Sequence, residues 1–255
     1  MTSRPRPERR KGHPMTRIWN VVRLHLVNRM AYVTLPWIIL GSAFLITIAI
    51  WMILRSVGVT SGFDGSASSP QFSGALLSIL IYLLVAAVMA INLTFPFALG
   101  FSVTRREFYL GTALTFGLVS AANAVVLTVL ASIEQATNGW GLNGRLFTVP
   151  WGGGGTPIEH WFGFFALQLL FSFAGAAIAT IYMRWRINGM VVFWVVGGAA
   201  LVGLFALIAY TNSWAAIGSW MTANGTTGMA AWSLLVSALA GLAGYAMLRR
   251  ATPKN

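Results

Sequence analysis

Six long apolar runs, none with an ionisable side chain near its centre, constrain this chain more than any other feature. A run of roughly 20 apolar residues crosses a hydrocarbon core of about 30 Å as an α-helix. The runs cover residues 31–54, 72–93, 108–133, 158–183, 188–210 and 229–248. The sequence therefore predicts an all-α, polytopic membrane protein with six transmembrane helices within residues 31–248.

The composition excludes an ordinary soluble domain. Hydrophobic residues make up 57% of the chain and charged residues 9%, whereas soluble domains contain about 45–50% and about 25%. Cysteine is absent, which excludes a disulfide framework, thiolate catalysis and cysteine-ligated zinc. The first run follows a long basic segment and precedes no small-x-small cleavage site, so we expect a retained helix rather than a signal peptide.

The net charge of +12 is distributed unevenly along the chain. Of the 17 Lys and Arg residues, all but Arg55 and Arg145 fall on one side of the predicted membrane. Because cytoplasmic loops carry an excess of basic residues, we expect both termini in the cytoplasm and a multi-pass protein of the plasma membrane. The positive charge therefore indicates how the protein is oriented in the membrane, and it does not indicate a nucleic-acid partner.

The segments outside the spans have different characters. Residues 1–14 are basic and proline-containing, as in a disordered tail, and residues 249–255 form a short cytoplasmic tail. Residues 15–30 repeat apolar side chains at helical spacing, which predicts an amphipathic helix in the inner membrane interface, with a solvated helix as the alternative. Residues 211–228 carry no charge but are rich in Asn, Ser and Gly, which favours a re-entrant or interfacial segment.

Ionisable residues inside a membrane usually mark proton paths or active sites, and the predicted spans hold none near their centres. We place Glu107, Glu134 and Glu159 at span ends that water reaches, and His160 as a solvated interfacial side chain. Asp64 lies in an outer loop. This pattern disfavours ion-coupled transport and predicts no catalytic residue, no metal site and no cofactor on this chain.

Three amides in the spans are costly in lipid and need partners. They are Asn92 near the inner end of the second span, Asn123 in the third and Gln168 in the fourth. Two interpretations remain open: hydrogen bonds between helices, or side chains that line a substrate path.

The stretch from Asn92 to Gly111 is the most informative part of the sequence. We expect Pro96 and Gly100 to break the second span, after which Phe97 and the charged run Arg105, Arg106 and Glu107 lie in one cytoplasmic turn. A loop that only fixes orientation needs the arginines but not the aromatic side chains. The turn could therefore also be a docking surface for a soluble partner.

This turn resembles the one between the second and third spans of the permease subunits of type-2 ABC exporters, a bacterial transporter family. The corresponding residues are Gly100, Thr104, Arg105, Arg106, Phe108 and Tyr109. The basic leader helix, the six spans and the dipping segment before the last span extend the resemblance over most of the chain. The outer loop at residues 134–157 has no counterpart in it.

The resemblance implies that this chain is not itself an enzyme. The turn from Phe97 to Tyr109 would be a coupling helix seated on a separate ATP-binding cassette ATPase, which would bind ATP and Mg²⁺, and the leader helix would move with it. A second permease chain, identical or not, would complete a transporter that exports or flips an amphipathic drug, peptide or lipid-like substrate. The alternative is a non-transporting membrane anchor or sensor whose cytoplasmic turn recruits a regulator.

Overall fold

The computed structural model describes residues 14–27, 30–58, 71–100, 103–148 and 155–250. Nearly all of these residues are helical, which confirms the predicted helical class. The α-helices are α1 (Pro14–Val27), α2 (Leu35–Ser56), α3 (Leu77–Met89), α4 (Phe95–Gly100), α5 (Arg105–Ala136), α6 (Pro157–Tyr210) and α7 (Trp214–Arg250). Three π-helical turns, η1 (Met30–Thr34), η2 (Ala90–Thr94) and η3 (Gly139–Asn143), and two short parallel strands, β1 (Gln71–Phe72) and β2 (Gly144–Arg145), complete the described elements.

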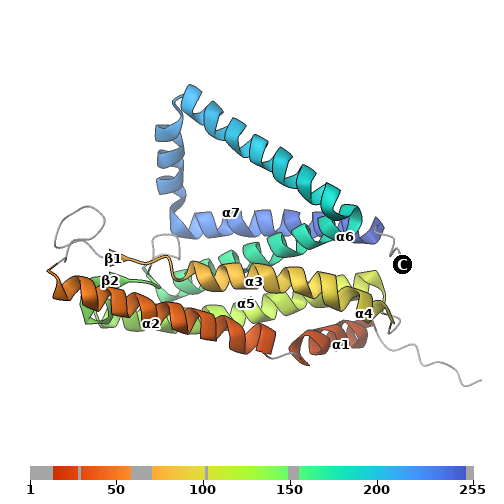
Figure 1. Cartoon of the computed structure of the whole chain (residues 1–255), viewed down its shortest axis with the longest axis horizontal. Helices are drawn as coiled ribbons and strands as arrows, with labels where there is room; N and C mark the ends of the chain where they lie inside the picture. The colour runs from red at the N-terminus through yellow and green to blue at the C-terminus, as the bar shows by residue number, and fades with distance from the viewer. Residues whose placement is uncertain (1–13, 28–29, 59–70, 101–102, 149–154, 251–255) are drawn as a thin grey trace, which may run out of the picture.

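Five helical segments are long and apolar enough to cross a membrane. They are Tyr32–Ser56, Leu77–Ala98, Arg105–Ala136, Pro157–Tyr210 and Trp214–Arg249. Figure 1 shows α2, α3, α5, the first part of α6 and the last part of α7 side by side, with α1 against one end of this bundle. The structure is therefore that of a helical protein built to reside in a membrane.

The longest helix, α6, contains a reversal of the chain. Arg186 has φ 55° and ψ −145°, so the helix on either side of it changes direction, and its second half leaves the bundle obliquely (Figure 1). Gly189 allows this turn to be tight, because a Cβ there would overlap the side chain of Trp185. The second half, residues 187–210, is apolar and largely exposed.

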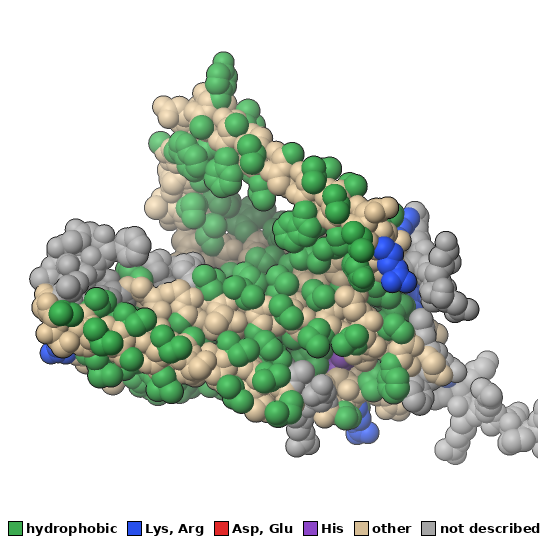
Figure 2. All heavy atoms as spheres, viewed as in Figure 1, with side chains coloured by type: hydrophobic (Ala, Val, Ile, Leu, Met, Phe, Trp, Pro, Cys, Tyr) green, Lys and Arg blue, Asp and Glu red, His purple; other side chains and the backbone are tan. Residues whose placement is uncertain are grey.

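The segment expected to dip into the membrane, residues 211–228, is mostly helical. Its helix begins at Trp214 and is continuous with α7 apart from a break at Gly225, where φ is 61° and ψ −177°. This first part of α7 returns from the tip of the α6 arm to the bundle (Figure 1). Apolar side chains cover the visible face of both projecting segments (Figure 2).

The expectation that Pro96 breaks the second span is wrong, because the helix continues from Leu77 to Ala98. Proline lacks an N–H and clashes with the carbonyl four residues earlier, here that of Asn92. The wider π-helical turn η2 ends two residues before Pro96, and η1 ends two residues before Pro36 in the same way. In both places a π-helical turn accommodates the proline without ending the helix.

Two hydrophobic clusters fill the bundle. We call one the Leu127 cluster, which joins Ile79, Leu80, Leu127 and Phe164 among others, and the other the Phe116 cluster, which joins Ala87, Phe116 and Ala176 among others. Together they hold α3, α5 and α6 as one packed unit.

Candidate functional site

The bundle has one basic end, to which several helices bring arginines. Figure 2 shows most of the visible Lys and Arg side chains there, close to the break in α6 and the end of α7. The arginines of the predicted inner side whose side chains are described are Arg17, Arg23, Arg105, Arg106, Arg184, Arg186 and Arg249. We call this the basic end and the opposite one the Glu134 end.

At the basic end, the start of α5 is fixed by a capping box. The Oγ1 of Thr104 accepts from the N–H of Glu107 at 3.2 Å, and Glu107 Oε2 accepts from the N–H of Thr104 at 3.0 Å. This reciprocal pair satisfies two backbone donors that the helix leaves open. A guanidinium nitrogen of Arg17 in α1 lies 3.6 Å from Glu107 Oε1. Glu107 therefore serves helix capping and a link to α1.

The predicted coupling turn is divided between interior and surface. Arg105 Nη1 donates to the carbonyls of Leu248 (3.2 Å) and Arg249 (3.4 Å), where a cation meets the carboxyl-terminal end of α7. Phe108 is fully buried. The Tyr109 hydroxyl donates to the carbonyl of Gly241 inside α7. These three residues attach α5 to the bundle.

The other residues of the turn lie at the surface. Phe97 is exposed on α4, and Gly100, Thr104 and Arg106 are also exposed. Residues 101 and 102 lie outside the described part of the chain. The surface that a soluble partner could contact therefore consists of an aromatic ring, a polar helix start and one arginine.

Helix α1 packs closely against α5. Val21 and Val22 are buried, and a Cβ on Gly111 of α5 would lie only 2.5 Å from Cβ of Val21. His25 is 3% exposed; its Nε2 lies 2.9 Å from Thr112 Oγ1 and its Nδ1 lies 3.4 Å from the Tyr32 hydroxyl. The predicted helix is thus confirmed, and it contacts protein with the face that was expected to meet lipid. Residues 1–13 of the predicted tail lie outside the described residues.

We expect this attachment to weaken in acid. Burial lowers the pKa of His25 from 6.5 to about 4, so the docked helix holds a neutral ring. The ring faces Tyr32, Thr112 and Phe108, none of which compensates a positive charge. Stability is therefore complete above pH 6.5 and falls as the pH approaches 4, by up to about 3 kcal/mol.

The measurement is denaturant unfolding at pH 7.5 and pH 5.0 for the wild type and His25→Gln, which cannot titrate. The Arg17–Glu107 pair is common to both proteins, so their difference isolates the histidine. An equal loss of stability on acidification in both would contradict the assignment.

At the opposite end, Glu134 organises the segment that follows α5. Its side chain is 0% exposed, so the expectation that water reaches it is wrong. The carboxylate accepts from the backbone N–H groups of Leu146 (2.9 Å), Phe147 (3.1 Å) and Thr148 (2.8 Å), from Trp140 Nε1 (3.1 Å) and from the Thr148 hydroxyl. Several donors converging on one carboxylate satisfy its charge without a counter-ion.

This carboxylate holds a compact and unusual turn. Asn138, Trp140 and Asn143 all have positive φ, which is uncommon outside glycine. Arg55 Nη1 at the end of α2 donates to the carbonyl of Gly141 at 2.9 Å. Gly144 packs so closely on the Trp51 ring that a Cβ would overlap it. Residues 137–148, which belong to the loop that the sequence left unassigned, thus form an ordered structure that we call the cap.

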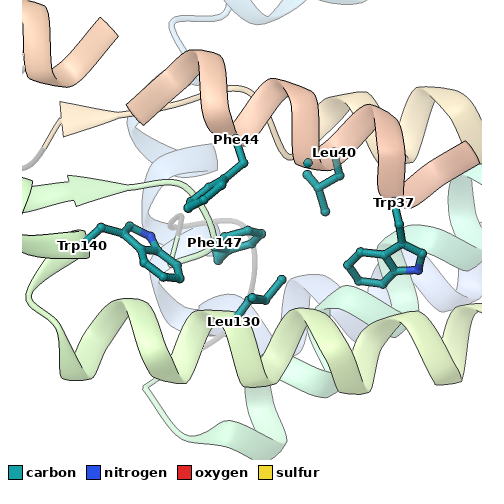
Figure 3. A pocket seen from close by; sticks show the side chains of 7 residues that line it. Trp37, Leu40, Phe44, Leu130, Trp140 and Phe147 are labelled. Atoms are coloured by element: carbon teal, nitrogen blue, oxygen red, sulfur yellow. The ribbon is translucent and has the colours of Figure 1, made fainter. Parts of the chain in front are cut away.

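An apolar cavity of about 200 Å³ lies beneath the cap. Figure 3 shows Trp37, Leu40 and Phe44 projecting from α2 toward Leu130 of α5, with Trp140 and Phe147 at the cap side. Gly41 completes the lining. It is a partly open pocket with an almost entirely apolar lining, and its volume suits a small apolar group about as large as a benzene ring.

His160 is also buried, so the expectation of a solvated side chain is wrong. Its Nε2 lies 3.0 Å from Nε2 of Gln135, and its ring stacks on Phe164 at 6.2 Å. Glu159, by contrast, forms the capping box of α6 with Thr156. These contacts give both residues structural roles.

The three amides lie at different places. Asn92 is half-buried in η2, whereas Asn123 is 6% and Gln168 0% exposed inside the bundle. Asn92 is therefore the most exposed of the three, whereas the other two amides are enclosed in the bundle. Within the described residues, no three His, Cys, Asp or Glu side chains form a group that could hold a metal ion.

Sequence reasoning missed the importance of Glu134, although the sequence contains a signal for it. An acid in the last turn of a helix opposes the helix dipole, so such a residue needs donors from elsewhere.

The fold and these sites define a helical membrane protein with an arginine-rich end and an ordered cap. Comparisons with protein families, with curated proteins and with solved structures found no match.

Proposed function

We propose that this chain is the membrane-spanning permease subunit of an ATP-binding cassette exporter. The observation that carries the proposal is the turn between α4 and α5, where Phe97 and Arg106 are exposed beside a capped helix start. Arg105, Phe108 and Tyr109 connect this surface to α7 and to the core. A force applied to the turn would thus reach both, as coupling to a partner ATPase requires.

The proposal includes six membrane passes, because the break at Arg186 divides the 54 residues of α6 into two helices that each suit one crossing. It also places both termini and the basic end in the cytoplasm of a bacterial cell, with the chain in the plasma membrane. ATP and Mg²⁺ bind the partner ATPase in this scheme.

An amphipathic substrate suits the described features. The cavity beneath the cap offers an apolar surface, and Asn92 offers an amide at the half-buried turn η2. The exposed apolar arm of residues 187–210 provides a surface for lipid or for a second permease chain. The competing hypothesis of an anchor or sensor uses the same turn but predicts no transport and no stimulated ATP hydrolysis.

The test is Arg106→Glu, which reverses an exposed charge without removing a described contact. We expect ATPase activity that co-purifies with the wild-type chain to fall at least about tenfold, since the docking surface loses its only exposed arginine in this turn. Protein yield and thermal unfolding should be unchanged.

The control is Arg184→Glu, another exposed arginine of the basic end, whose guanidinium lies over the neighbouring Trp185 ring. This variant should retain the activity. Arg105→Glu should also lower the unfolding temperature, because it removes the contact with α7. Unchanged co-purified ATPase activity in Arg106→Glu would contradict docking at this turn. ATPase binding without substrate movement in vesicles would favour the anchor hypothesis.

A further inference from the structure

A layer of polar side chains separates the two hydrophobic clusters at the middle of the bundle. In α5, Val119 packs against the Phe116 cluster and Ala124 belongs to the Leu127 cluster. Between them lie Ser120 and Asn123, which are 1% and 6% exposed. The sequence of α5 thus changes from one apolar cluster to the other through two buried polar residues.

The two neighbouring helices also pass from one cluster to the other. In α6, Leu167 and Phe171 pack with the Leu127 cluster, whereas Leu169 and Phe173 pack with the Phe116 cluster. Gln168 and Ser172 lie within this stretch, one helical turn apart. In α3, Leu80 belongs to the Leu127 cluster and Tyr82 packs with the Phe116 cluster. Leu83 is the buried α3 residue next to this boundary.

Three polar atoms of the two amides in this layer are buried without a hydrogen-bond partner among the described residues. Both polar atoms of the Gln168 amide and Nδ2 of Asn123 are closed off from solvent without one. Buried polar groups in proteins are almost always paired, with protein or with ordered water. A buried water needs two to four polar partners. Ser120 and Asn123 lie one helical turn apart on α5, as Gln168 and Ser172 do on α6, and all four are buried where the two clusters meet.

We propose that Ser120, Asn123, Gln168 and Ser172 form an internal binding site for water. None of the four side chains ionises, so the site suits a neutral guest that both donates and accepts hydrogen bonds. The proposal does not depend on transport or on an ATPase. It assigns to the two amides a role inside one chain, since both side chains are buried within it.

The test compares two leucines of α3 that differ only in their position relative to the layer. Leu83 is 4% exposed beside it, and Leu80 is 3% exposed within the Leu127 cluster. Leu83→Met and Leu80→Met each introduce a thioether with little change in volume. The full chain in lipid nanodiscs receives a short X-ray pulse, which converts water molecules to hydroxyl radicals where they lie, and mass spectrometry measures sulfoxide at each methionine.

We expect sulfoxide to form at least about tenfold faster in Leu83→Met than in Leu80→Met, because bound water next to the first supplies the radical. Adding Gln168→Leu to Leu83→Met should reduce its rate to that of Leu80→Met. Equally slow oxidation of the two single variants would overturn the proposal, since the amides then pair within the protein. Equally fast oxidation, or a fast rate that Gln168→Leu leaves unchanged, would overturn the assignment to this layer.

Discussion

Glu134→Ala is expected to destabilise the protein by about 3–5 kcal/mol, because it leaves several buried donors without an acceptor. The backbone N–H groups of Leu146, Phe147 and Thr148 lose their partner, as does Trp140 Nε1. The measurement is thermal unfolding in detergent, where we expect a decrease of roughly 10 °C. Trp140, which is partly exposed, should become more accessible to a water-soluble quencher.

Two comparisons make this result specific. Glu134→Gln keeps the size of the side chain but turns an NH2 group toward N–H donors, so it should lose most of the same stability. Glu159→Ala removes the other glutamate of this end, whose capping box is exposed and contributes about 0.5–2 kcal/mol. Equal effects of Glu134→Ala and Glu159→Ala would show that the carboxylate does not organise the cap.

Gly175→Leu should separate α3 from α6 and lower the yield of folded protein severely. A Cβ at Gly175 would overlap the carbonyl oxygen of Leu84 and lie 3.1 Å from the Ala87 side chain. Backbone atoms cannot move aside as a flexible side chain can, so we expect a loss of at least about 3 kcal/mol, at the upper end of overpacking effects. The measurement is the free energy of unfolding, in detergent, of the protein that does fold.

The matched control is Gly197→Leu in the projecting half of α6. A Cβ there meets nothing within 4 Å, and glycine is a poor helix former, so this variant should be neutral or slightly more stable. Gly175→Leu with wild-type stability would mean that α3 and α6 do not pack as described.

The long apolar helices could be predicted from the sequence because hydrophobic length alone specifies them. The start of α5 is harder to predict from the sequence. The third apolar run begins at residue 108, whereas the helix begins at Arg105, because a capping box extends the helix into charged residues. Pro96 was misjudged because a π-helical turn can absorb a proline. The break at Arg186 falls between the fourth and fifth predicted runs, because Arg184 and Arg186 interrupt the apolar sequence there.

In the candidate sites, the sequence identifies the residues but not which of them are buried. Residue types identified Arg105, Phe108 and Tyr109 as one motif, but only their contacts with α7 and the core distinguish these anchoring residues from the exposed Phe97 and Arg106. Glu134 and His160 lie at the ends of predicted spans, and this position predicts exposure to solvent. Their burial depends on contacts with residues distant in the sequence, which the sequence alone does not show. Gln168 was found because an amide in a lipid-spanning segment is costly whatever surrounds it.

The first turn of α5 has a mechanical consequence. Its Glu107 contacts Arg17 near the beginning of the described chain, and its Arg105 contacts the carbonyls of Leu248 and Arg249 near the other end. A rigid displacement of this single turn would therefore pull on the first and the last helix at once. Helix α1 and the last turn of α7 are thus both attached to the first turn of α5, and a partner bound at Arg106 would contact the turn that joins them.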